Sequence, residues 1–127
     1  GAIEHFEALK LQQQADILVN IGNSQSDQLP GKVFEYLVSD KPIFHIRGCS
    51  QDPTESYLKD HSCAFIADNN EFSIFMALER ILATHARGAL QTSAESSQML
   101  VEKHGWPARA LVLNQVLADA VSRSRFA

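Results

Sequence analysis

The sequence predicts an α/β fold built on a short parallel sheet. Three apolar runs, at residues 15–21, 41–46 and 63–67, have the length and composition of buried strands. The segments around them carry apolar residues at helical spacing. Alternating strands and helices are typical of parallel βαβ units, so we expect one sheet covered by helices. The length of 127 residues and the hydrophobic content of 45% fit a single globular domain, residues 1–127.

Start signals in the sequence predict where the helices begin. A proline suits the first helical turn, and a small polar residue before that turn can cap its free N–H groups. Asp52 and Thr92 are each followed three residues later by a glutamate, which is the spacing of a capping box. In the helix after Asn70, the expected buried face consists of Ile74, Phe75, Leu78, Ile81 and Leu82. The expected helices cover residues 3–14, Pro30 to about Ser39, Asp52 to about Lys59, a long stretch after Asn70, Thr92 to about Lys103, and a last stretch from Pro107.

Composition and charge argue against several classes of protein. The net charge of −4 and the scattered basic residues disfavour a nucleic-acid-binding surface. No apolar run approaches the roughly 20 residues that span a bilayer, and no signal-peptide pattern is present. Cys49 and Cys63 lack metal-ligand spacing. We therefore expect a cytoplasmic protein with free thiols, no metal and no cofactor.

The junction between the first expected strand and the next helix is the candidate binding site. In open α/β sheets, ligands bind beyond the carboxyl ends of the strands, and a polar loop follows the strand there. A helix that begins near Pro30 offers free N–H groups to a phosphate, and Gly31 lets the backbone approach it closely. The predicted site residues are Asn23, Asp27, Gln28, Leu29, Pro30, Gly31, Lys32 and Glu35.

The charged residues of this set suggest a hydroxylated, phosphorylated ligand. Glu35 lies one helical turn after Gly31, where its carboxylate can accept hydrogen bonds from the adjacent hydroxyls of a ribose. Asp27 lies in the loop, within reach of a sugar hydroxyl. Lys32 either adds a cation or points to solvent. Because proline and glycine also occur before helices as simple capping residues, the residues alone leave both interpretations open.

Three segments of the sequence, at residues 15–23, 28–37 and 40–43, resemble the C-terminal domain of GT-B fold glycosyltransferases. They are most similar to the retaining, group 1 bacterial enzymes that use nucleotide-diphospho sugars. The resemblance implies a partial Rossmann-like three-layer sandwich and assigns Glu35 to the nucleotide ribose and Asp27 to the donor sugar. Most members have glutamate at the position of Asp27, and the Gly-Phe-Gly loop that often follows is absent. Residues 28–32 are similar instead to members that act on bacterial surface polysaccharides.

The resemblance also implies parts that this sequence does not contain. The family's donor domain begins with three further β/α units, whose Arg and Lys hold the donor diphosphate, and an acceptor domain precedes it. We therefore expect a fragment or a truncated relative that binds nucleotides weakly and is inactive alone. The expected partners are a nucleotide sugar, the missing N-terminal part, and a second copy that forms a homodimer through an exposed sheet edge. The full-length enzyme would transfer a sugar to an acceptor hydroxyl in polysaccharide synthesis, in the cytoplasm or peripherally at the inner membrane.

Two other functions remain open. A nucleotide-sugar epimerase shares the GT-B architecture, but it needs acid and base residues that the sequence does not identify. A non-catalytic α/β interaction domain needs no ligand at all. Its receiver-like form is disfavoured because Asp16 precedes its strand instead of following it.

Overall fold

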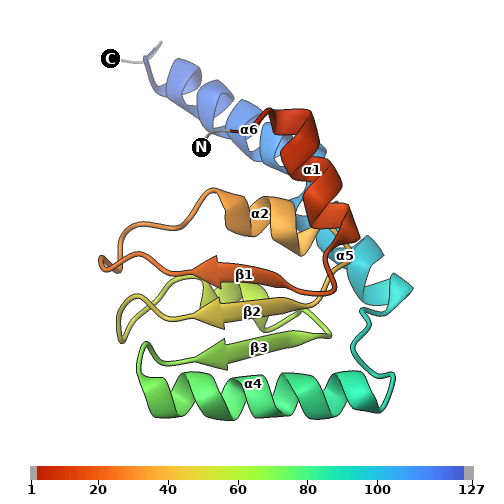
Figure 1. Cartoon of the computed structure of the whole chain (residues 1–127). Helices are drawn as coiled ribbons and strands as arrows, with labels where there is room; N and C mark the ends of the chain where they lie inside the picture. The colour runs from red at the N-terminus through yellow and green to blue at the C-terminus, as the bar shows by residue number, and fades with distance from the viewer. Residues whose placement is uncertain (1–2, 125–127) are drawn as a thin grey trace.

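The computed structural model describes residues 3–124, apart from the side chains at positions 94, 96, 97, 123 and 124. It shows an α/β structure with a three-stranded parallel sheet of order β1-β2-β3. The strands are β1 (Leu18–Ile21), β2 (Ile43–Ile46) and β3 (Ala64–Ala67). All three run in the same direction, so the loops that follow them gather at one edge (Figure 1). The predicted parallel sheet is confirmed, and each strand ends at its expected residue.

Helices cover both faces of this sheet. One face carries α4, which lies along the sheet at the bottom of Figure 1, and the other carries α2, α3 and α5. None of the helices within residues 3–124 has both the length and the apolar character needed to cross a membrane. The helices are α1 (His5–Gln14), α2 (Lys32–Leu37), α3 (Glu55–Leu58), α4 (Glu71–Ala86), α5 (Ala94–His104) and α6 (Trp106–Ser124).

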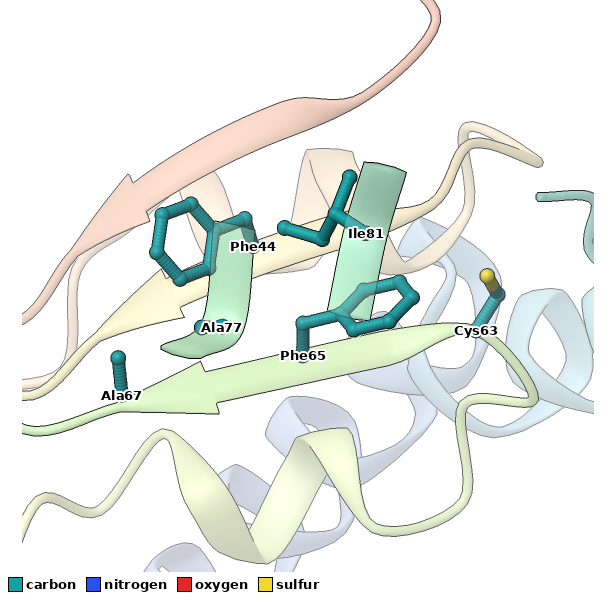
Figure 2. Close-up of a cluster of buried hydrophobic side chains, with 6 residues drawn as sticks. All are labelled: Phe44, Cys63, Phe65, Ala67, Ala77 and Ile81. Carbon is teal, nitrogen blue, oxygen red and sulfur yellow. The ribbon is translucent and has the colours of Figure 1, made fainter. Parts of the chain in front are cut away.

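Two clusters of buried side chains join the helices to the sheet. Successive strand residues point to opposite faces, so Ile43 packs toward α2 while Phe44 packs toward α4. Figure 2 shows the α4 side, where Ala77 and Ile81 of the helix lie over Phe44 and Phe65. The cluster on the other face consists of Val33, Leu37, Ile43, Leu58 and Leu100.

The predicted buried face of α4 is partly wrong. Ile81 is buried and Ile74 packs against the core, but Phe75, Leu78 and Leu82 are exposed. The residues that meet the sheet are Ile74, Ala77 and Ile81, which share one narrow stripe of the helix. Phe75, Leu78 and Leu82 each follow one of these residues in the sequence, so they lie further round the helix. The narrow sheet does not cover that side of α4.

Of the predicted helix start signals, the one at Asn70 is confirmed and the one at Thr92 is wrong. Asn70 caps α4 as expected, since its side chain accepts the N–H of Ser73 at 2.9 Å. The prediction that Thr92 caps the next helix is wrong, because α5 begins only at Ala94. The Thr92 hydroxyl instead donates to the carbonyl oxygen of Asp40 at 3.1 Å and ties the start of α5 to the turn after α2.

Two parts of the fold contribute little to the core. α1 buries none of its residues, and its Phe6 is 80% exposed. Strand β1 lies at the edge of the sheet, and its Val19 and Ile21 are exposed although they lie on the same face as α4. The homodimer through this edge stays a prediction.

His61 makes the stability of the fold depend on pH. It is buried in the turn before β3, where its Nδ1 accepts the N–H of Cys63 at 3.2 Å. Burial lowers the pKa of His61 below its ordinary value of 6.5, so the unfolded chain binds a proton more readily than the folded one. The contribution of the buried, neutral His61 to the free energy of unfolding is therefore fully present above pH 6.5. It decreases as the pH falls from 6.5 toward the lowered pKa.

We accordingly expect a lower melting temperature at about pH 5.5 than at about pH 7.5. The difference should shrink in His61→Gln, which keeps an acceptor for Cys63 and cannot be protonated in this range. His5→Gln, on exposed α1, is the control and should keep the full difference. Thermal unfolding followed by circular dichroism gives the melting temperature of each variant at both pH values. A difference between the two pH values that is as large in His61→Gln as in the unchanged chain would contradict the role of His61.

Candidate functional site

The predicted site residues fall into a loop and the first turns of a short helix. Asn23 donates from its side-chain amide to the carbonyl oxygen of Gln28 at 3.2 Å, which closes the loop after β1. Leu29 packs against the core cluster below α2, so its role is structural. Asp27 is exposed within this loop. The expected helix start at Pro30 differs slightly from the observed one, because α2 begins at Lys32.

Glu35 is the residue of this set with the most unusual surroundings. Its Oε2 is buried and has no hydrogen-bond partner among the described residues. The Nζ of Lys32 lies 3.9 Å from this oxygen, which is too far for a hydrogen bond. A buried carboxylate oxygen without a partner is costly, so this atom is suited to accept a hydrogen bond from a ligand.

Glu35 borders a cavity of about 700 Å³, a volume typical of small-molecule sites. The cavity lies between α1, α2 and the junction of α5 with α6. Of the eight predicted site residues, the structure brings only Gly31 and Glu35 to its wall. Asn23, Asp27, Gln28, Leu29, Pro30 and Lys32 do not line it.

The part of the cavity wall at the junction of α5 with α6 contains two residues that the sequence did not identify. The guanidinium of Arg109 lies over the ring of Phe34, with its Cζ 3.4 Å from the ring centroid. His104 packs beside the same ring and against Tyr57, at centroid distances of 6.4 Å and 5.5 Å. Arg109 Nε and His104 Nε2 are both buried without a hydrogen-bond partner among the described residues. The residues that line the cavity therefore include three with a buried polar atom that no described residue satisfies.

The protonation state of His104 follows from its surroundings. Burial lowers the pKa of His104, and the positive charges of Lys103 and Arg109 lower it further, against the opposing charge of Asp60. The imidazole is therefore neutral at neutral pH. A neutral ring can offer its Nε2 to a ligand as a donor or an acceptor, depending on the tautomer.

A second polar group lies at the carboxyl edge of the sheet, but it is buried away from the cavity. Asn20 and His45 are paired across β1 and β2, and their Nδ2 and Nδ1 atoms lie 2.9 Å apart. The Nε2 of His45 lies 3.3 Å from Oδ2 of Asp52. Asp52 also accepts the N–H groups of Gly48 and Thr54, at 3.0 Å and 2.9 Å. These contacts fasten the loop after β2 to the end of β1.

Asp52 stays charged in this buried network. Burial by itself would raise the pKa of Asp52, but the donated hydrogen bonds from Gly48 and Thr54 and the nearby His45 outweigh it and lower the pKa. The side chains of Asn20, His45 and Asp52 are all buried, so they hold the loop after β2 in place and do not contact a ligand. The prediction that Asp52 is the N-cap of the next helix is wrong, because α3 begins at Glu55 and Thr54 occupies the cap position. Asp52 instead accepts the N–H of Thr54 in the turn before α3.

Part of this buried polar network could be expected from the sequence. Asn20 and His45 are polar residues in the middle of otherwise apolar strands, which is unusual unless they have a buried partner. The partner is apparent only once the strands are in register. Arg109 and His104 carry no comparable signal, because they lie far from Glu35 in the chain.

No metal site accompanies these residues in the part of the chain from residue 3 to residue 124. No three His, Cys, Asp or Glu side chains in that part are grouped so as to hold an ion. Both cysteines are free thiols. No family model, curated protein or solved structure matches the chain.

Proposed function

We propose that this chain is the nucleotide-sugar-binding part of a glycosyltransferase donor domain. In the full-length enzyme it would help to transfer a sugar from a nucleotide-diphospho sugar to an acceptor hydroxyl, without a metal, in surface polysaccharide synthesis. The observation that carries the proposal is the buried Oε2 of Glu35, which has no hydrogen-bond partner among the described residues, in a residue that borders a cavity of about 700 Å³. The adjacent hydroxyls of a ribose are suitable donors to such an oxygen.

The backbone beside Glu35 also supports this proposal. Gly31 lines the same cavity, one turn before Glu35, and no atom lies within 4 Å of the place where its Cβ would be. A ligand can therefore approach the backbone closely at this position. The three parallel strands and the loop after β1 agree with the resemblance of residues 15–43 to the donor domain of this family.

The proposal includes weak binding by the chain alone. The Arg and Lys that hold the donor diphosphate in the family would lie in β/α units outside this sequence. The acceptor domain would supply the second wall of the catalytic cleft. Because transfer requires donor and acceptor to be held together, the isolated chain is expected to bind nucleotides without catalysing transfer.

Glu35→Ala tests the ribose assignment. We expect UDP-glucose or GDP-mannose to shift the NMR signals of residues 31–35 and of other residues that border the cavity. Loss of a charge-assisted hydrogen bond should weaken this binding by about tenfold or more in Glu35→Ala. Glu79→Ala, which removes an exposed carboxylate on α4, is the matched control and should leave the binding unchanged.

Two outcomes would overturn the ribose assignment. One is a set of shifts centred on α4 or on the outer edge of β1, and the other is equal binding in Glu35→Ala and Glu79→Ala. Binding that depends on Glu35 also separates the proposal from a non-catalytic interaction domain. Analysis of the product formed by the full-length enzyme separates sugar transfer from epimerisation.

A further inference from the structure

The cavity beside α2 contains opposite charges that do not neutralise each other. Glu35 and Arg109 both line it, yet no ion pair joins them or links Arg109 to any other described acid. Each has one buried polar atom that forms no hydrogen bond with any residue the structure describes. Buried polar groups are nearly always paired, so both atoms are suited to a ligand that reaches across the cavity.

Arg109 is held in a way that leaves its donors available. Its guanidinium lies 3.4 Å from the centroid of Phe34, and this contact uses the face of the group and not its N–H edges. Its backbone N–H bonds to Gly105, which fixes the start of α6 at the wall of the cavity. An arginine whose orientation is set by an aromatic ring, and whose side chain has no hydrogen-bond partner among the described residues, is suited to bind a phosphate.

His104 and Trp106 extend this wall. His104 is 8% exposed, and its buried Nε2 has no hydrogen-bond partner within the described part of the chain, so it adds a second polar group near Arg109. Trp106 also lines the cavity, but it is 82% exposed, which leaves its indole face open to stack against a planar ring. The cavity thus combines an acceptor, an anion-binding group and an aromatic surface.

We propose that Arg109 and His104 complete the cavity as a site for a nucleoside monophosphate group. Arg109 and His104 hold the phosphate, Glu35 accepts from a ribose hydroxyl, and Trp106 stacks on the base. The assignment of the hydroxyl to Glu35 rests on the proposed function. The assignment of the phosphate to Arg109 rests on the contacts of Arg109 itself and does not depend on the proposed function.

Trp106 provides the measurement because it is the only tryptophan in the chain. Titration of the 127-residue chain with UMP should change its fluorescence, and uridine and inorganic phosphate serve as probes of the two halves of the ligand. We expect Arg109→Gln to weaken UMP binding by about tenfold or more and to leave uridine binding unchanged. Arg80→Gln is the matched control, because Arg80 also lies over a phenylalanine ring, that of Phe65, on the α4 side of the sheet.

The outcomes separate this inference from the proposed function. Equal UMP affinity in Arg109→Gln and Arg80→Gln overturns the phosphate site. Sensitivity to Arg109→Gln but not to Glu35→Ala supports the phosphate site and overturns the ribose assignment. No response to UMP overturns both. If Arg109→Gln does not fold, Trp106→Ala is the second variant, since its exposed ring is dispensable for the core. UMP binding measured by NMR that is as tight in Trp106→Ala as in the original chain overturns the stacking part.

Discussion

Gly48→Ala is expected to lower the free energy of unfolding by about 3 kcal/mol, because the new methyl group has no room. A Cβ at residue 48 would lie 2.0 Å from the carbonyl oxygen of Asn23 and 2.4 Å from that of Gly22. Both contacts are with backbone atoms, which cannot move aside as a flexible side chain would. The loops after β1 and β2 would have to separate, and Gly22 would lose its hydrogen bond to Ile46.

Gly31→Ala is the matched control for this prediction. Residue 31 has helical backbone angles, φ −56° and ψ −33°, and its Cβ would meet nothing within 4 Å. Alanine there should leave stability unchanged or raise it by about 0.5 kcal/mol, because the unfolded chain loses freedom. Urea unfolding followed by circular dichroism measures both variants. Similar midpoints for the two would show that the loops do not pack as described.

Asp52→Ala is expected to cost about 3 kcal/mol or more, because it leaves several buried groups without their acceptor. The N–H groups of Gly48 and Thr54 would lose their hydrogen bonds, and His45 would lose the carboxylate 3.3 Å from its Nε2. Thr54 and His45 cannot turn to water instead, since both are fully buried.

Two further variants isolate the cause of the loss. Asp52→Asn keeps the size of the side chain and one acceptor oxygen, so its loss should be smaller than that of Asp52→Ala. Asp27→Ala removes an exposed carboxylate in the loop after β1, and its effect should stay within about 0.5 kcal/mol. The same urea titration applies, and equal losses in Asp52→Ala and Asp27→Ala would refute the role of the buried network.

The sheet was predictable because each strand carries its own local signal. Short runs such as 63–67 are apolar and flanked by polar residues, and the Asn70 cap depends only on residues of its own turn. The buried face of α4 was less predictable. Phe75 and Leu82 have the right hydrophobicity, but whether they are covered depends on how wide the sheet is. The width of the sheet is a property of the tertiary structure, so the sequence of the helix contains no signal for it.

The candidate site also combines residues whose positions were predictable from the sequence with residues whose positions were not. Gly31 and Glu35 lie one helical turn apart, so their shared position on the cavity wall follows from helix geometry alone. Arg109 and His104 reach the same cavity through the packing of α5 against α2 and through the turn into α6. The Asn20–His45–Asp52 network likewise requires the register of β1 against β2. These long-range placements could not be read from spacing in the chain.

The absence of buried residues in α1 has a consequence for how the cavity opens. His5, Leu9, Gln12 and Gln13 form one wall of it, yet no buried side chain fastens that wall to the sheet. A helix of ten residues is too short to persist by its own hydrogen bonds in water. Its amide protons therefore exchange with solvent through local opening, at a free energy far below that of global unfolding. The wall on α1 can move aside while β2 and its neighbours stay folded, so access to Glu35 and Arg109 does not require the core to open.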